Sequence, residues 1–161
     1  MGKKTRIQYL SKFRENKFPN LARAGYRVTS SETPLYNCIA FAAGDSTQWW
    51  DLPPYHWPGA IVSEYIEGLE SVFASLGYFR CQGGDLEPGY QKVALYVDSA
   101  GKWQHAARQS EDGEWESKLG PWEDIRHRTP NAFGGSEYGN VMYYMKRALP
   151  ASKQKRRAIK Y

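Results

Sequence analysis

Apolar side chains recur at helical spacing in the middle of the chain. Between residues 61 and 76 they stand at steps of three and four, at Ile61, Val62, Tyr65, Ile66, Leu69, Val72, Phe73 and Leu76. Such steps place side chains on one face of an α-helix. Gly77 follows, a residue that often ends helices. The pattern predicts an amphipathic helix over 61–76 that packs on the core by this face.

A shorter run of small apolar residues predicts a second helix, buried on all sides. The run Cys38-Ile39-Ala40-Phe41-Ala42-Ala43 is preceded by Asn37 and followed by Gly44. Asn is a favoured N-cap, and Gly is the commonest residue just beyond a helix end. We therefore expect a helix over 38–43 with Cys38 in its first turn.

Strand-like segments dominate the second half of the chain. Three of them are separated by short connectors of Ser, Ala, Gly, Glu and Asp that are typical of hairpins: 92–98, 102–109 and 114–119. They predict an antiparallel meander. A short helix at about 122–126 and a closing strand at 139–145 complete an expected α+β fold.

Three stretches show no regular period. Residues 1–30 mix charged and apolar residues and are interrupted by Pro19, so we expect an irregular lead-in. Segment 45–59 holds three of the six tryptophans and three prolines, which predicts a lid or pocket wall packed over the domain. The end, 151–161, has five basic residues and no acid, which indicates a disordered tail after one domain over 1–150.

The charge distribution argues against specific nucleic-acid binding. The chain of 161 residues has 22 Lys and Arg against 17 Asp and Glu, a net charge of +5. Three basic residues precede Ile7 and five follow Pro150, where no acid stands, so the stretch between carries 14 basic residues against all 17 acids and sums to −3. The positive ends alone favour only non-specific, salt-sensitive attraction to anions.

Two cysteines, Cys38 and Cys81, are too few for a disulfide framework and fit no zinc spacing. We therefore expect reduced thiols, no metal and no cofactor. The chain has neither the apolar run of a signal peptide nor the ~20 apolar residues of a membrane span. These features predict a cytoplasmic protein without membrane insertion.

Cys38 and His105 are the residues that could carry chemistry. A thiol at a helix N-terminus lies where backbone N–H groups favour negative charge, which lowers its pKa. His105 follows on an expected strand and could act as the base of such a nucleophile. The alternative is that Cys38 is an inert core residue and His105 a structural one.

Several motifs resemble an uncharacterised bacterial domain family over about residues 26–147. They are Tyr36-Asn37-Cys38-Ile39-Ala40-Phe41-Ala42, Trp49-Trp50, Trp57-Pro58-Gly59, Leu76-Gly77-Tyr78, the segment 87–96, His105-Ala106-Ala107-Arg108-Gln109 and Ser117-Lys118-Leu119-Gly120. At a greater distance, a Cys on a helix followed by a His on a strand resembles papain-like cysteine peptidases, including the cell-wall peptidase and transglutaminase-like branches. This second resemblance implies a papain-like single domain, with the Cys-bearing helix packed on an antiparallel sheet, and acyl transfer by Cys38 and His105.

The same resemblance implies a polar third residue that orients the imidazole, and strand register decides its identity. If residues 110–113 form the connector, Gln109 pairs with Glu114, and Glu116 lies diagonal to His105. One bulge turns Ser117 toward His105 instead. Gln109 and Ser117 are the candidates for this role, followed by Glu116.

Two functions follow from these features. The leading hypothesis is a cysteine hydrolase or acyltransferase that acts on an amide bond, as peptidase, amidase or deamidase, with a peptide or other amide as substrate. Asn37 would then help to position the thiol, or serve only as N-cap, and Trp49 and Trp50 would line a substrate cleft, or only pack. The rival hypothesis is a non-enzymatic module that binds a protein partner through the Trp-rich surface of 45–59.

Overall fold

The computed structural model describes residues 9–133, 135 and 137–151, which form seven strands and four short α-helices. One antiparallel sheet contains all seven strands in the order β1-β6-β5-β4-β3-β7-β2. The strands are β1 (Tyr26–Ser30), β2 (Phe79–Cys81), β3 (Tyr90–Val97), β4 (Trp103–Gln109), β5 (Trp115–Lys118), β6 (Asp124–His127) and β7 (Asn140–Ala148). The expected antiparallel α+β fold is confirmed.

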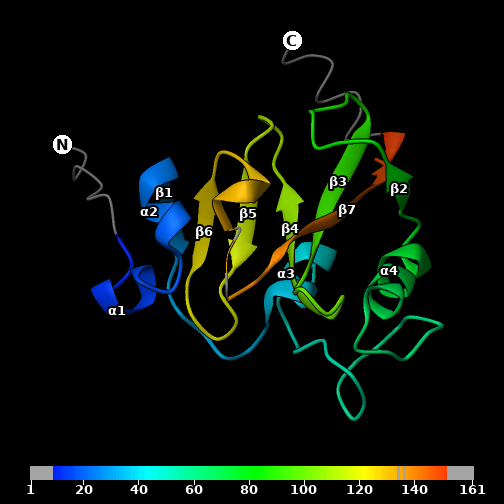
Figure 1. The fold of residues 1–161 in the computed structure, drawn as a ribbon. Coiled ribbons are helices and arrows are strands. Elements are labelled where there is room, and N and C mark those ends of the chain that lie inside the picture. Colours follow the sequence, from blue (N-terminus) through cyan, green and yellow to red (C-terminus); the bar gives the residue numbers. More distant parts are fainter. Residues whose placement is uncertain (1–8, 134, 136, 152–161) are drawn as a thin grey trace.

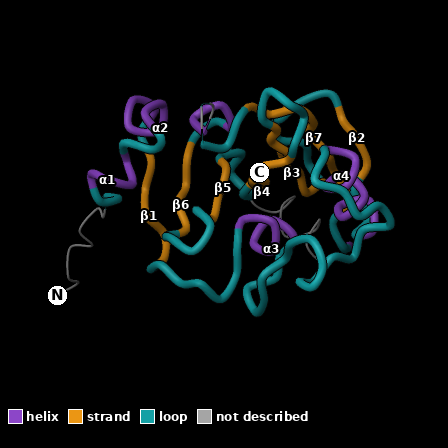
Figure 2. The backbone as a smooth tube through the Cα atoms, turned by 60° about the horizontal axis from the view of Figure 1, so that its bottom comes forward, coloured by secondary structure: helices purple, strands orange, loops and turns teal. Residues whose placement is uncertain are grey.

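Helices cover both faces of the sheet (Figures 1 and 2). They are α1 (Lys12–Glu15), α2 (Pro19–Ala24), α3 (Cys38–Ala43), α4 (Ile66–Ser75) and the 3-10 helix η1 (Pro130–Phe133). Side chains of α3 and α4 belong to one apolar cluster, and side chains of α2 and η1 belong to another. Strand β3 supplies both clusters in alternation, Val93 and Leu95 to the first and Ala94 and Tyr96 to the second. The sheet therefore separates two cores.

The ends of α3, Cys38 and Ala43, are those that the neighbouring residues predicted. Asn37 caps it by accepting a hydrogen bond from Ala40 N–H at 3.2 Å. Gly44 ends it in the left-handed conformation with φ of +91°, which a side chain would disfavour. The predicted strands over 92–98, 102–109, 114–119 and 139–145 correspond to β3, β4, β5 and β7.

The helix expected over 61–76 begins five residues later, at Ile66. The backbone before it is used by the sheet instead: Glu64 C=O accepts from Trp103 N–H at 3.1 Å, and Gly101 C=O accepts from Ile66 N–H at 3.0 Å. Ile61 and Val62, which the helical pattern had placed on the buried face, are therefore exposed.

Two other expectations about elements were wrong. The segment expected as a helix at 122–126 forms strand β6, because its backbone pairs with both β5 and β1. The stretch expected as irregular, 1–30, contains α1, α2 and β1; Pro19 opens α2 at the first helical position, where its missing N–H costs nothing. Except for Ala151, the predicted disordered tail at 151–161 lies outside the described residues. Within the described part of the chain, no helix has both the length and the apolar character to cross a membrane.

Candidate catalytic site

Asn37 fixes the start of α3 and ties it to the Trp-rich segment. Its Oδ1 accepts from Trp50 N–H at 3.1 Å as well as from Ala40, and its Nδ2 donates to Trp50 C=O at 2.7 Å. The side chain is 5 % exposed, so both contacts are shielded from water. Asn37 therefore acts as an N-cap and a cross-link, which sets the position of the adjacent Cys38.

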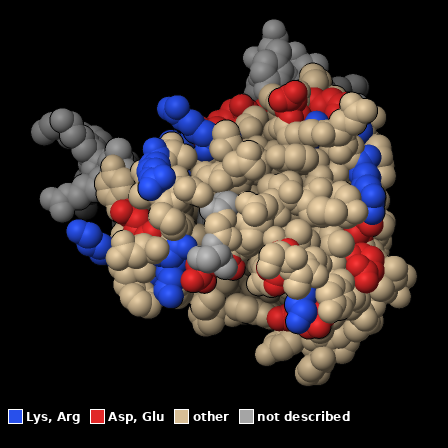
Figure 3. All heavy atoms as spheres, in the orientation of Figure 1, with Lys and Arg blue, Asp and Glu red and all other residues tan. Residues whose placement is uncertain are grey.

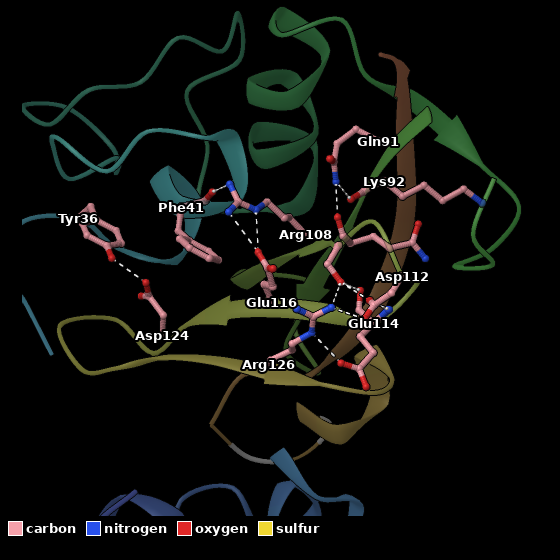
Figure 4. Close-up of polar contacts among 12 residues, drawn as sticks. Tyr36, Phe41, Gln91, Lys92, Arg108, Asp112, Glu114, Glu116, Asp124 and Arg126 are labelled. Carbon is pink, nitrogen blue, oxygen red and sulfur yellow. Dashed lines mark hydrogen bonds and ion pairs between the residues drawn. The ribbon is translucent and has the colours of Figure 1, made fainter. Parts of the chain in front are cut away.

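The other end of α3 is held by Arg108 of β4 (Figure 4). Its Nη1 donates to Phe41 C=O at 3.2 Å, and its Nε and Nη2 both lie 3.2 Å from Glu116 Oε2 on β5. The guanidinium also stacks over the Phe41 ring at 4.4 Å. A cation at the carboxyl end of a helix interacts favourably with the helix dipole and can donate to its last carbonyl groups. Arg108 thereby links α3 to two strands.

A buried lysine lies on the α3 side of β5. Lys118 is fully buried, and its Nζ donates to the carbonyl groups of Thr33, at 2.8 Å, of Gly120, at 2.7 Å, and of Trp122. Burial lowers the pKa of this ammonium group. With three carbonyl acceptors and the Tyr36 ring at 5.0 Å, Lys118 stabilises the loops around α3.

The Cys38 thiol is buried, with 7 % of the residue exposed. Burial raises the pKa of the thiol to about 11, although the N–H groups of Ala106, Ile39 and Cys38 itself act in the opposite direction. The expectation of a lowered pKa at the start of α3 was thus wrong, because desolvation outweighs the local N–H groups.

The contact between the thiol and Ala106 brings Cys38 to the strand residue that follows His105. The His105 ring itself is fully buried. It stacks on Tyr138 with ring centroids 4.3 Å apart and planes 4° apart, and it meets the edge of Tyr96 at 5.0 Å. Tyr96 and Tyr138 belong to the second cluster, whereas Cys38 and Ala106 belong to the first. The Cys38 thiol thus packs with the cluster on the α3 side of the sheet, whereas the His105 ring packs with the other cluster, and β4 lies between them.

Ser117 of β5 is a polar residue hydrogen-bonded to His105. Its Oγ lies 3.0 Å from His105 Nε2. The strand pairing has the bulged register, because Gln109 pairs with Trp115 and Arg108 with Glu116. Ser117 therefore faces His105, as one of the two predicted registers required.

The other candidates for the third residue point elsewhere. Gln109 Nε2 donates to Gly84 C=O at 2.7 Å, beyond the end of the β4–β5 pair, and Glu116 is engaged by Arg108. The geometry therefore joins Ser117, and neither Gln109 nor Glu116, to the imidazole.

A residue that the sequence had not suggested for this site, His127, lies on the far side of Ser117. Its Nε2 is 2.9 Å from Ser117 Oγ, and its Nδ1 is 2.8 Å from Thr129 C=O. Burial lowers the pKa of His127 to about 4, and that of His105 is lowered as well. Both rings are neutral at pH 7. His127 was missed because segment 122–126 was predicted as a helix, and only a strand beside β5 brings His127 to Ser117.

Two of the three tryptophans of 45–59, Trp50 and Trp57, make internal contacts. Trp50 is 6 % exposed, and its indole N–H donates to Asp45 at 2.8 Å. Trp57 donates to Ile61 C=O at 2.9 Å and stacks on Trp103 at 5.5 Å. Trp49 is half-buried. Of the two open interpretations, these contacts favour packing for Trp50.

Charged side chains do not gather in the middle of the face that Figure 3 draws. In the face drawn in Figure 3, Lys and Arg alternate with Asp and Glu around the margin, and uncharged residues cover the middle. Among the residues that the structure describes, no three His, Cys, Asp or Glu side chains are grouped to hold a metal ion.

The comparisons with known proteins identify a family. A family model described as "Domain of unknown function (DUF7689)" matches residues 27–146, and the chain belongs to that family. No curated protein and no solved structure matches the chain. The matched range includes Cys38, His105, Ser117 and His127, so the whole candidate site lies within the family domain.

Proposed function

We propose that the chain is a cysteine hydrolase or acyltransferase with a papain-like arrangement, acting on an amide bond of a peptide or related substrate. The observation that carries this proposal is the position of the Cys38 thiol at the backbone of Ala106, next to a histidine whose ring is held by Ser117. Nucleophile, base and orienting residue come from α3, β4 and β5, in that order along the chain.

The roles follow from the chemistry of the three groups. The imidazole of His105 takes the proton of Cys38 as Sγ forms a bond to the amide carbon, and the carbonyl oxygen becomes an oxyanion. The N–H of Cys38 is a donor for that oxyanion. When the C–N bond breaks, the imidazolium returns its proton to the amine, and water or another nucleophile then accepts the acyl group.

The electrostatics favour a neutral resting pair. The raised pKa of Cys38 and the lowered pKa of His105 keep thiol and imidazole uncharged at pH 7. A preformed thiolate is therefore absent, and the proton has to move to His105 when the sulphur reacts. This distinguishes the proposed mechanism from one in which the thiolate forms on its own.

The pH dependence of Cys38 alkylation tests the proposal. If His105 takes the proton, the rate with iodoacetamide stays nearly constant between about pH 6 and pH 9, because the total number of protons on the pair does not change. In His105→Gln, the rate instead rises about tenfold per pH unit, as the free thiolate becomes more abundant. Peptide mapping separates Cys38 from Cys81.

Two control variants complete the experiment. Cys38→Ser removes the Cys38 signal and identifies the peptides that carry Cys81. His56→Gln changes an exposed histidine outside the site and leaves the profile unchanged. The proposal is refuted if the rate of Cys38 alkylation in the unaltered protein rises tenfold per pH unit. It is also refuted if Cys38 and Cys81 are alkylated at equal rates that the His105 substitution does not change.

The rival function, a protein-binding module, depends on the Trp-rich segment. The burial of Trp50 and the stacking of Trp57 on Trp103 give this alternative less support than the Cys38 site.

A further inference from the structure

A chain of three hydrogen bonds joins His105 to the backbone of the β6–η1 connection. It runs from Thr129 C=O to His127 Nδ1 at 2.8 Å, from His127 Nε2 to Ser117 Oγ at 2.9 Å, and from Ser117 Oγ to His105 Nε2 at 3.0 Å. Ser117 and His105 are fully buried and His127 is 2 % exposed. All three bonds therefore lie inside the protein.

The direction can be derived from the end at Thr129. A carbonyl oxygen only accepts, so the hydrogen of this bond is on His127 Nδ1. A neutral imidazole has a single N–H, so His127 Nε2 accepts, and the hydroxyl of Ser117 donates to it. The Ser117 oxygen can then only accept from His105, which places the hydrogen on His105 Nε2 and the lone pair on its Nδ1.

The opposite direction would need one of two unfavourable states. Either His127 Nδ1 would present a lone pair to the Thr129 carbonyl oxygen, leaving two buried acceptors face to face, or His127 would carry two hydrogens and a positive charge. Because burial lowers the pKa of His127 to about 4, only about one molecule in a thousand is charged at pH 7.

We propose that His127 is a positioning residue that, through Ser117, holds His105 in the tautomer with a basic Nδ1. The tautomer itself is a property of the fold, whereas its use in acyl transfer rests on the proposed function. In that use, Nδ1 takes the proton of the Cys38 thiol while Nε2–H stays bonded to Ser117. The hydrogens of Ser117 and His127 need not move.

Ring ¹⁵N NMR spectroscopy measures the tautomer directly. The chain has three histidines, and one substitution at each assigns the signals. At pH 7 we expect His127 as the Nδ1–H form and His105 as the Nε2–H form. In His127→Phe, which keeps a ring but removes the acceptor, the Ser117 hydroxyl is released to donate to His105 Nε2. The Nδ1–H form of His105 then becomes populated.

Ser117→Ala gives a second, smaller perturbation that leaves the His127–Thr129 bond intact. His105 loses its fixed tautomer, while His127 keeps its Nδ1–H form. We call the hydrogen-bonded series Thr129, His127, Ser117 and His105 the relay. Ser75→Ala is the matched control, because the Ser75 hydroxyl donates to Val72 C=O on α4, away from the relay. In both relay variants, and not in the control, Cys38 alkylation at pH 7 is expected to slow by about tenfold or more.

The outcomes separate the two proposals. A hydrogen on His105 Nδ1 in the unaltered protein overturns the relay, and so does an unchanged His105 tautomer in a folded His127→Phe protein. If the tautomers are as expected but Cys38 alkylation ignores His105, the relay stands and the proposed acyl transfer fails.

Discussion

Acid should destabilise the protein well above the pH at which carboxylates titrate. Burial lowers the pKa of His127 to about 4, whereas a histidine in the unfolded chain has a pKa of about 6.5. Between these values the unfolded state binds a proton that the folded state does not, so the free energy of unfolding falls as the pH falls. For His127 alone the loss between pH 7 and pH 5 is about 2 kcal/mol. His105, whose pKa is lowered too, adds to it.

Urea unfolding at pH 7, 6 and 5 in the presence of a reductant measures this loss. Carboxylates have pKa values near 4 in unfolded chains, so they contribute little above pH 5. His127→Phe is expected to be less stable at pH 7, because Ser117 loses its acceptor, but to lose about 2 kcal/mol less between pH 7 and pH 5. A loss below about 1 kcal/mol in the unaltered protein would show that the two rings are not held neutral, and would refute the reasoning.

Two further predictions concern the framework of the site. Arg108→Met removes the cross-link between α3 and Glu116 and should lower the free energy of unfolding by about 2 kcal/mol in urea titrations; a change below about 0.5 kcal/mol, as is usual for an exposed ion pair, would contradict this role. Gly139→Ala would place a Cβ 1.9 Å from Val97 C=O at a φ of +71° and should destabilise the fold by more than about 3 kcal/mol. Gly101→Ala, at a φ of +83° with open space around the new Cβ, is the control, with an expected loss of about 1 kcal/mol.

The elements that the sequence predicted well are those whose causes are local. Helix α3 has its N-cap at Asn37 and its stop at Gly44, so no distant residue was needed to find its ends. The meander of β3, β4 and β5 likewise depends on turns between neighbouring segments. Such signals can be derived from a few adjacent residues.

The elements that were missed depend on distant partners. Strand β6 pairs with β1, which lies about a hundred residues earlier, and this pairing decides the state of a segment too short to be a stable helix alone. The first turn expected for α4 was lost for a similar reason, since Glu64 bonds the start of β4 instead of continuing the helix. Periodicity within one segment carries no information about such competition.

The candidate site divides in the same way. Cys38 and His105 could be selected from residue type and element, and Ser117 could be placed as one of two registers. The length of the connection between β4 and β5 decides between the two registers. It has five residues, 110–114, and is closed by a hydrogen bond from Ser110 N–H to Glu114 C=O at 2.8 Å, so that Gln109 pairs with Trp115. His127 required the β6 pairing itself. Strand register, which residue types do not reveal, therefore limited how much of the candidate site could be predicted from the sequence.

The resting charges also define what the pH profile of Cys38 measures. Burial raises the pKa of the Cys38 thiol to about 11 and lowers the pKa of the His105 imidazole, so moving the proton from Cys38 to His105 is unfavourable if the two groups do not interact. Opposite charges about 4 Å apart attract by about 4 kcal/mol at an effective dielectric constant of 20, which offsets part of that cost. Only then does the ion pair outnumber the free thiolate at pH 7 and give a flat profile. The slope of the alkylation rate against pH therefore reports whether Cys38 and His105 interact at contact range.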